Sequence, residues 1–430
     1  MEQKRVLLIC DAFPPAFAPR MGFLAKYLKE EEWDVKVITR DLSLSNSKMD
    51  FNYLNADISV DRVPFQHGKI TPKTLCKKIL SFLGITWYKS ERDLFLACNQ
   101  YLDENKCDII IASTWNNHIL RTAYNIAKKY SIPCIIDLRD IPEQFPATFV
   151  KIVYRNIRNL FQRRNKYLKS ADAITTVSEW HKNFLSKLNP NAYLIYNGYD
   201  PDIFHRTKEA VTEQFAITYA GTILSNVKCG RTPSLLFDVA EQLFKDNIIQ
   251  PEKFVIRFYT DQKTINWISD STAKRSVGQF VKCFNFVPAK EVPQILSSSS
   301  LLLLLADKES ANGPKGIMTT KVFEYLAIGR NIICVKSDEA ALEKLIRESN
   351  GGIAVRNFEE LYSYLKDKYL EWLQSGYLKS HVNEEFVKQF SRKNQCIGFI
   401  KVMENLLQKS KSERHSKITE HVMKEADDEH

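Results

Sequence analysis

The chain has 430 residues, of which 44% are hydrophobic and 11% aromatic, and it carries a formal net charge of +10. This length exceeds one ordinary hydrophobic core and predicts two domains of about two hundred residues each. The apolar content excludes a disordered protein, and the 26% of charged residues is normal for a soluble globular one.

Short apolar segments alternate with helical patterns through the first half of the chain. The expected strands are residues 6–10, 35–38, 108–111, 133–136, 173–177 and 192–195. Strands that alternate with helices predict a parallel sheet with helices on both faces.

A second series of strands begins after the turn-rich segment 197–200 and the charged stretch 206–209. Its expected strands are residues 216–219, 254–258, 281–284, 301–305, 332–335 and 352–355. We place the domain boundary near residue 205. This gives an N-terminal domain over 1–205 and a C-terminal domain over 206–385, both α/β, Rossmann-like and doubly wound. Ligands of such sheets bind at the carboxyl ends of the strands, so we expect a cleft between the two sheets.

The last part of the chain is predicted to be helical as far as residue 408. We expect residues 386–408 to form a C-terminal helix that packs back on the N-terminal domain. Residues 409–430 mix charges of both signs with almost no apolar content, which predicts a disordered tail.

No apolar run reaches the roughly 18 residues of a membrane-spanning helix, and the N-terminus enters a strand instead of a signal-peptide core. We therefore expect a cytoplasmic protein. The nine cysteines are scattered without a Cys-x-x-Cys pair, which favours reduced thiols over disulfides or zinc. No other group of metal ligands stands out, so we expect neither a metal nor a cofactor.

Two basic segments interleave with apolar residues. The first, 149–169, carries Lys and Arg side chains and no acidic one, and the second extends over 69–92. Such segments are either solvated helix faces or peripheral contacts with the inner face of an anionic membrane. Nucleic acid is not an expected partner, because no recognition motif accompanies the charge.

The segment 319–329 lies between the apolar runs 301–305 and 332–335 and predicts a short helix. Lys321 and Glu324, three residues apart, are neighbours on one face of it. A helix that starts at Thr320 offers free N–H groups and a positive dipole end to an anion. Phosphate is therefore the natural ligand of this helix start.

Glycines or charged residues follow several of the other predicted strands. The segments are Phe13-Pro14-Pro15 with Arg20 and Gly22, Asp137-Leu138-Arg139-Asp140, Ala171–Ser178 with Tyr196–Asp200, Ala220-Gly221-Thr222 with Lys228 and Arg231, and Phe286-Val287-Pro288. In this order, and together with the Thr320 helix, they resemble the retaining nucleotide-sugar glycosyltransferases of the GT-B fold. The resemblance extends to about residue 400 and is to the family 4-like group that contains bacterial polysaccharide and lipopolysaccharide transferases.

The resemblance implies a donor site in the C-terminal domain. Glu324 aligns with the family's ribose-binding Glu, and Lys321 with the basic residue of the same motif. Lys228 and Arg231 are implied as ligands of the diphosphate. The remaining implied donor-binding residues are Gly22, Gly221, Thr222, Val287 and Thr320.

The resemblance also implies residues beside the sugar and the acceptor. Arg139 and Asp140, with Lys228, are the implied catalytic residues. Arg20, His118 and Asp137 are expected on the acceptor side. Many members of the family carry a sugar-contacting acid where this chain has Gly316. Glu309, Asp307 or backbone amides of the same loop are the candidates to replace it.

The implied function is that of a retaining glycosyltransferase of the hexosyltransferase type. It would transfer a sugar from a nucleotide diphosphate sugar to a glycan or lipid-linked acceptor in cell-surface polysaccharide biosynthesis. A nucleotide-sugar epimerase on the same fold and a non-catalytic GT-B scaffold protein are the alternatives. A dehydrogenase is disfavoured, because no Gly-x-Gly-x-x-Gly follows the first strand.

Overall fold

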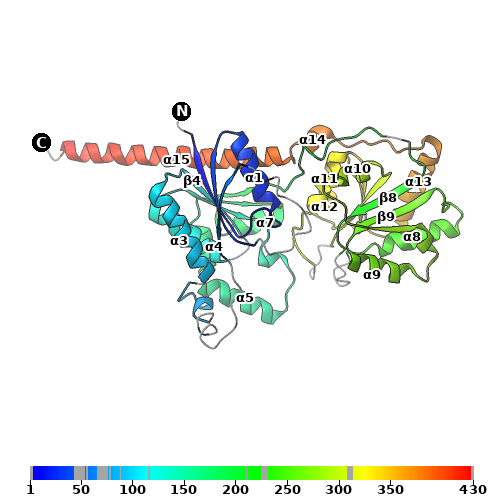
Figure 1. The fold of residues 1–430 in the computed structure, drawn as a ribbon, viewed down its shortest axis with the longest axis horizontal. Coiled ribbons are helices and arrows are strands. Elements are labelled where there is room, and N and C mark those ends of the chain that lie inside the picture. Colours follow the sequence, from blue (N-terminus) through cyan, green and yellow to red (C-terminus); the bar gives the residue numbers. More distant parts are fainter. Residues whose placement is uncertain are drawn as a thin grey trace. The chain divides into compact units, whose positions relative to one another are not determined.

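The structure is a computed structural model that describes residues 3–42, 54, 57–64, 76, 79–87, 89–114, 117–209, 211–223, 231–307 and 313–427, the last stretch by its backbone from 413 on. The chain divides into two compact units (Figure 1). Unit 1 comprises Met1–Pro142, Ala147–Tyr196 and Gln395–His430, and unit 2 comprises Glu143–Pro146 and Asn197–Asn394. The change from unit 1 to unit 2 at Tyr196 lies nine residues before the expected boundary, 205 − 196 = 9.

Unit 1 contains a parallel sheet whose seven described strands have the order β3-β2-β1-β4-β5-β6-β7. The strands are β1 (Arg5–Cys10), β2 (Asp34–Arg40), β3 (Ser59–Val63), β4 (Ile109–Ser113), β5 (Cys134–Leu138), β6 (Ala173–Thr176) and β7 (Ala192–Leu194). The order reverses between β1 and β4, and ligands of doubly wound sheets bind at such switch points.

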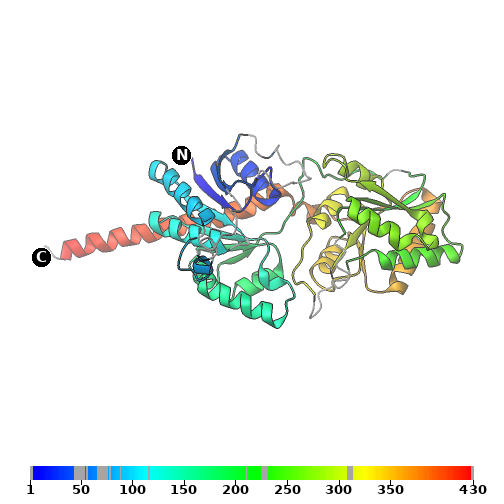
Figure 2. The ribbon, with the colours of Figure 1, turned by 60° about the horizontal axis from the view of Figure 1, so that its bottom comes forward.

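Helices cover both faces of this sheet (Figures 1 and 2). They are α1 (Pro19–Glu30), α3 (Lys89–Glu104), α4 (Asn117–Tyr130), α5 (Phe149–Phe161), α6 (Arg164–Lys169), α7 (Glu179–Leu185) and, from Gln395 on, α15 (Arg392–Asp427). One apolar core lies between the sheet and α1 with α15, and a second lies between the sheet and α3 with α4. Strands buried on both faces read as continuous apolar runs, which is why the sequence predicts them well.

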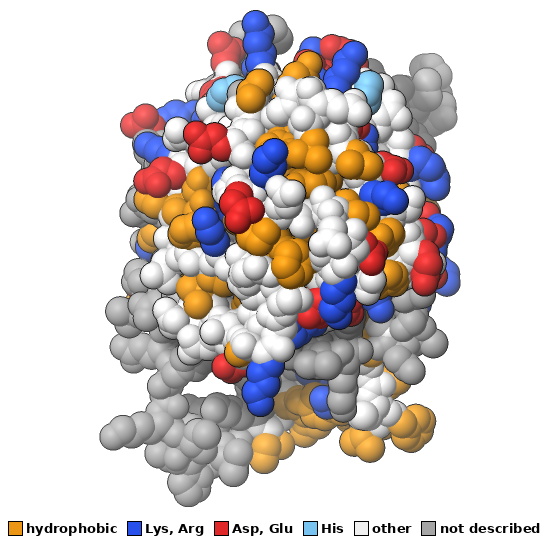
Figure 3. Space-filling view, turned by 90° about the vertical axis from the view of Figure 1, so that its right-hand side faces the viewer, with side chains coloured by type: hydrophobic (Ala, Val, Ile, Leu, Met, Phe, Trp, Pro, Cys, Tyr) orange, Lys and Arg blue, Asp and Glu red, His pale blue; other side chains and the backbone are white. Residues whose placement is uncertain are grey.

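Unit 2 contains a second parallel sheet, with the described strands in the order β10-β9-β8-β11-β12-β13. They are β8 (Phe215–Ala220), β9 (Phe254–Thr260), β10 (Val281–Asn285), β11 (Leu301–Leu305), β12 (Asn331–Val335) and β13 (Gly352–Val355). The helices are α8 (Ser234–Lys245), α9 (Gln262–Thr272), α10 (Val292–Ser297), α11 (Thr320–Ile328), α12 (Ala341–Glu348), α13 (Phe358–Ser375) and α14 (Glu384–Lys388). Basic and acidic side chains are interspersed on the face of this unit shown in Figure 3, as on an ordinary solvated surface.

The strands predicted from apolar runs are all present in the structure, but the prediction missed β3. Its residues alternate between exposed and partly buried positions, and the strand lies at the edge of the sheet. Edge strands need few apolar side chains, so Ser59–Val63 carries no strong strand pattern.

The C-terminal part differs from the expected disorder. Residues 409–427 continue α15, a single helix that ends at Asp427, whereas residues 428–430 lie outside the described residues. Lys, Glu and Ala have good intrinsic helix propensity, so a charged segment can extend a helix that is anchored elsewhere. The anchor is in unit 1, where Cys396, Phe399, Val402 and Met403 lie in the core.

Along the described part of the chain, no helix combines the length and the apolar content needed to cross a membrane.

Candidate functional site

Lys321 and Gly221 come together at the carboxyl end of β8. Gly221 has φ +140°, a backbone conformation that L side chains rarely adopt, and its N–H donates to the Tyr259 carbonyl at 2.9 Å. A Cβ atom at this position would lie 2.5 Å from the Lys321 Nζ. The absence of a side chain at Gly221 therefore lets the Lys321 ammonium group lie directly against the backbone where β8 ends.

Glu324 lies one turn after Lys321 on α11, and the charge of each side chain shifts the pKa of the other. Burial lowers the pKa of Lys321, while the charge of Glu324 raises it and that of Arg231 lowers it. Burial raises the pKa of Glu324, and the charges of Lys321 and Arg392 lower it. In both groups burial is the largest cause, so the site holds a carboxylate and an ammonium group that are only partly solvated.

Arg231 brings a second positive charge to the same place. Its side chain hydrogen-bonds Tyr219, whose ring centroid lies 5.9 Å from the Lys321 Nζ. Burial raises the pKa of Asp307, just after β11, and the charge of Arg231 lowers it. Within the described part of the chain, the buried Nε of Arg231 has no hydrogen-bond partner. A guanidinium with a free donor beside a lysine is suited to bind an oxyanion.

The first turn of α11 contributes backbone groups to this place. Thr319 precedes the helix, and its side chain makes no capping hydrogen bond among the described residues. The N–H groups of the first turn, near Thr320, are therefore available to a ligand. Gly316 is buried, with φ +60°, in the loop before the helix. Thr222 follows Gly221, is exposed, and hydrogen-bonds the Asp261 carboxylate.

Val287 lies beyond the carboxyl end of β10, at the edge of the same sheet. It is half-buried, and the preceding Phe284 ring stacks on Tyr259 with centroids 4.8 Å apart. Because neighbouring parallel strands end at one edge, Val287 and the Gly221 turn belong to the same side of the sheet in unit 2.

In unit 1, Arg20 of α1 and Asp137 of β5 form a buried ion pair at 2.9 Å, with side-chain exposures of 4% and 0%. Ser113 and Thr175 also donate hydrogen bonds to Asp137, and Arg20 donates to the Tyr196 carbonyl. Hydrogen bonds of the pair therefore link α1, β4, β6 and the Tyr196 backbone to the end of β5, and Arg139 follows directly after this strand. Removal of one partner would leave the other charge buried.

Arg139 and Asp140 follow β5 and pair with each other at 2.9 Å, each a little over 40% exposed. Their partial exposure leaves both accessible to a ligand of unit 1. Gly22 of α1 has a packing role, since a Cβ there would lie 2.7 Å from the Pro14 Cγ.

His118 of α4 is half-buried and lines a cavity of about 510 Å³ in unit 1. Burial lowers its pKa to about 4, and the charges of Arg40, Arg158 and Arg121 act in the same direction. The imidazole is therefore neutral near pH 7 and can donate or accept a hydrogen bond.

Two predicted site residues, Lys228 and Glu309, lie outside the described residues. Conversely, Tyr219, Tyr325 and Arg392 were not among the residues predicted from the sequence. The Tyr325 hydroxyl accepts a hydrogen bond from the Ala220 N–H at 3.4 Å, and Arg392 lies close enough to Glu324 to lower its pKa. Tyr219 could have been noticed, because it stands at a predicted strand end. Arg392 carries no comparable signal.

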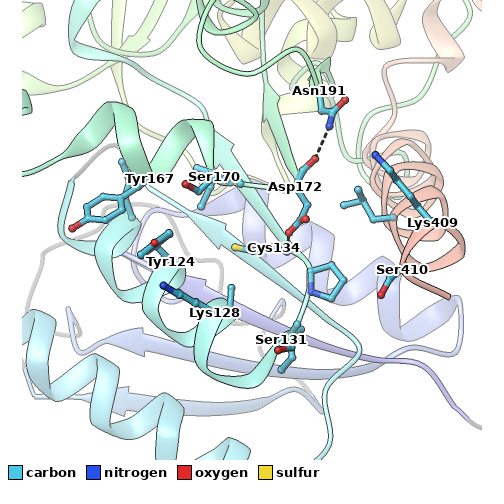
Figure 4. A pocket seen from close by; sticks show the side chains of 17 residues that line it. Tyr124, Lys128, Ser131, Cys134, Tyr167, Ser170, Asp172, Asn191, Lys409 and Ser410 are labelled. Atoms are coloured by element: carbon cyan, nitrogen blue, oxygen red, sulfur yellow. Dashed lines mark hydrogen bonds between the residues drawn. The ribbon is translucent and has the colours of Figure 1, made fainter. Parts of the chain in front are cut away.

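A separate cavity of about 560 Å³ lies at the amino ends of β5 and β6 (Figure 4). Its lining includes Cys134 and Asp172, and Asn191 donates a hydrogen bond to the Asp172 carbonyl at 3.1 Å. Lys409 and Ser410 of α15 contribute to one wall. None of the predicted site residues lines this cavity. Arg139 and Asp140 follow the other, carboxyl end of β5.

No protein-family model and no curated protein sequence matches the chain. Solved structures do match over almost its full length. Anabaena HepE in complex with UDP-glucose is similar with a TM-score of 0.62 and 13% identity, over 93% of this chain and 99% of that one. Sucrose-phosphate synthase from Thermosynechococcus elongatus is similar with a TM-score of 0.63 and 12% identity, over 94% and 100%.

The chain has the GT-B fold. This confirms the fold class predicted from the sequence, two doubly wound parallel-sheet domains. UDP-GlcNAc 2-epimerase from Methanocaldococcus jannaschii is similar with a lower TM-score of 0.51 and 10% identity, over 93% of this chain and 99% of that one. At such identities the similarity shows the fold alone, and the activity must be argued from the side chains.

Proposed function

We propose that the protein is a retaining, family 4-like glycosyltransferase that uses a nucleotide diphosphate sugar as its donor. The observation that carries the proposal is the group formed by Gly221, Arg231, Lys321 and Glu324. It joins two cations, a partly solvated carboxylate and a helix start at the carboxyl edge of one sheet. A diphosphate linked to a ribose matches this set of groups.

In this proposal the diphosphate binds Lys321, Arg231 and the N–H groups at Thr320, and Lys228 adds a further positive charge. The negative charge of the diphosphate grows as the glycosidic bond breaks, so these groups stabilise the transition state more than the ground state. They also make a metal unnecessary for the leaving group, and we propose none. Glu324 accepts hydrogen bonds from the ribose hydroxyls, and the backbone at Val287 contacts the base.

Transfer with retention needs no strong protein nucleophile in this scheme, because the leaving phosphate accepts the proton of the acceptor hydroxyl. Arg139 and Asp140 contact the sugar and the reacting atoms, and His118, as a neutral imidazole, hydrogen-bonds the acceptor. The buried Arg20–Asp137 pair acts as a positioning element, since Asp137 lies only two residues before Arg139. Glu309 or the backbone at Gly316 contacts the donor sugar.

The acceptor that we propose is a glycan or a lipid-linked sugar of cell-surface polysaccharide biosynthesis. HepE was solved with UDP-glucose, which makes UDP-sugars the first donors to test. A lipid-linked acceptor lies at the inner face of the membrane, so this proposal includes a peripheral position there.

The decisive experiment follows a radiolabelled nucleotide sugar incubated with the full chain, with and without an extract of lipid-linked glycans. The proposal predicts that the label appears on the lipid-linked glycans of the extract and that no labelled free sugar of altered structure is formed. The similarity to UDP-GlcNAc 2-epimerase makes an epimerase the second candidate. An epimerase would release the altered sugar without any acceptor. Donor binding without turnover would instead indicate the alternative of a non-catalytic scaffold protein.

A further inference from the structure

Helix α5 of unit 1 exposes its apolar side chains. All thirteen of its residues are described, and none of them is buried. Phe149, Val150 and Leu160 are 79%, 75% and 75% exposed. The exposed large apolar residues of the helix are Phe149, Val150, Val153, Tyr154, Ile157, Leu160 and Phe161.

These seven side chains form a single face. At 3.6 residues per turn they fall within an arc of about 140° around the helix axis. The opposite face, which points toward the protein, carries Arg155 and Asn159. Arg155 donates to the Pro142 carbonyl at 2.8 Å, and Asn159 accepts a hydrogen bond from Asn117 at 3.1 Å. Ile152 is half-buried on this inward side, but the other apolar side chains of the helix point outward, the reverse of a surface helix in water.

The apolar face continues on a neighbouring segment. The Phe82 ring stacks on Tyr154 with centroids 5.5 Å apart, and Gly84 approaches the Phe161 carbonyl so closely that a Cβ would not fit. Beside these contacts, Ile79 and Ile85 are 51% and 65% exposed. An apolar surface contributed by two segments and left in contact with water marks an interaction site.

The surroundings of α5 indicate what would cover it. Residues 149–169 contain seven Lys and Arg residues and no Asp or Glu. Lys151, Arg163, Lys166 and Lys169 are exposed. An apolar helix face beside exposed basic residues is complementary to lipid chains below anionic headgroups. A second copy of the same surface fits less well, because a symmetric contact would bring the basic residues of both copies together.

We propose that α5 is a docking helix that inserts its apolar face into the surface of an anionic phospholipid bilayer. The charge of 149–169 steers the chain to the membrane, and Phe149, Val150 and Leu160 enter the boundary between headgroups and acyl chains. The proposal deepens the peripheral membrane position proposed above by naming the helix that makes the contact. It concerns a surface other than the nucleotide site, so vesicle binding and nucleotide-sugar binding can fail separately.

The test is flotation of the full chain with vesicles of phosphatidylcholine alone or with 30% phosphatidylglycerol, a composition of our choosing. The wild-type chain should float with the anionic vesicles, and about tenfold less with the neutral ones. Val150→Glu combined with Leu160→Glu should reduce flotation about tenfold or more. Both positions are exposed, so the fold should persist, as far-UV circular dichroism and nucleotide-sugar binding can check.

Val211→Glu is the matched control, because Val211 is 74% exposed and lies in unit 2. It makes the same change at nearly the same exposure as Val150→Glu and should leave flotation unchanged. The proposal is overturned if the wild-type chain does not bind anionic vesicles, or if Val211→Glu weakens binding as much as the α5 variant. It is also overturned if analytical ultracentrifugation shows a dimer that only the α5 variant dissociates, since α5 would then bind a second copy.

Discussion

The Lys321 ammonium group lies between a glycine that leaves room for it and a glutamate one helical turn away. Its position depends on Gly221, where a Cβ would approach the Nζ to 2.5 Å. Arg231 and Arg392 add positive charge around Glu324 and Lys321. The excess of cations over carboxylates in this small volume is what makes a diphosphate the best-matched ligand.

Glu324→Gln should weaken donor binding strongly. An amide of nearly the same shape cannot offer the ribose hydroxyls two charged acceptor atoms, which should cost about 1.5–3 kcal/mol, or about 10- to 100-fold in Kd. Isothermal titration calorimetry with a nucleotide sugar measures the loss. Glu291→Gln, an exposed change in the same unit, is the control and should bind like the wild type. Unchanged affinity of Glu324→Gln would remove the ribose assignment.

Donor affinity should fall at both ends of the pH range. Glu324 must be ionised to accept the ribose hydroxyls, and burial raises its pKa above the ordinary 4.5. Affinity is therefore lost as the pH falls through that raised pKa. Burial lowers the pKa of Lys321 below 10.5, so its charge and the affinity are lost as the pH rises through it. Titration of a nucleotide sugar across pH measures both limbs.

The variant Glu324→Gln separates the two limbs of this profile. It should lack the acid limb and keep the alkaline one, because Gln does not titrate. An acid limb that persists in the variant would mean that another group controls binding at low pH.

Gly221→Ala should displace the Lys321 side chain and strain the backbone at φ +140°. We expect donor affinity to fall by about tenfold or more, since the charged contact to the diphosphate is lost. Gly398→Ala is the control, because its Cβ would meet only ordinary contacts at 3.6–3.8 Å in a helix. Wild-type affinity in Gly221→Ala would show that Lys321 does not bind the donor.

At the scale of elements, α15 makes part of the core of unit 1 although it is the last helix of the chain. Phe399 is fully buried there, and the Arg20 guanidinium lies 5.2 Å from its ring centroid. The helix thus supports the ion pair that holds the end of β5. A change in α15 beyond Gln395, where the helix belongs to unit 1, should therefore affect unit 1 before it affects the nucleotide site of unit 2.

Phe399→Ala should lower the free energy of unfolding by about 3–5 kcal/mol, because a large buried ring leaves a cavity. Urea unfolding followed by circular dichroism measures this loss. The exposed Lys401→Ala should change stability by less than about 0.5 kcal/mol. A loss below about 1 kcal/mol for Phe399→Ala would contradict the packing of α15 in the core.

The elements also show what the sequence can and cannot predict. Leu301–Leu305 and the other buried strands are predictable, because a parallel strand with two covered faces needs a continuous apolar run. Ser59–Val63 at the sheet edge has no such requirement and was missed. The apolar periodicity of α5 is visible in the sequence, but its outward direction is not, since an apolar face is normally assumed to be buried.

At the scale of the whole molecule, tertiary contacts decide which of the predicted residues can act together. The motif of Lys321 and Glu324 is local and was found from its spacing. The approach of Lys321 to Gly221 and of Arg392 to Glu324 joins segments far apart in the sequence, which no local pattern encodes. The fold was therefore predictable to a larger extent than the charge balance of the site.

The most direct test of the account is a thermal-shift titration of the full chain with UDP, GDP, ADP and TDP sugars. A ligand that binds only the folded chain raises its melting temperature by mass action. At a free ligand concentration of 100 times Kd, the free energy of unfolding rises by about 2.7 kcal/mol. The account predicts a rise for at least one nucleotide sugar in the wild-type chain and a much smaller rise in Glu324→Gln. No rise with any of them at millimolar concentration would contradict a nucleotide-sugar site in unit 2.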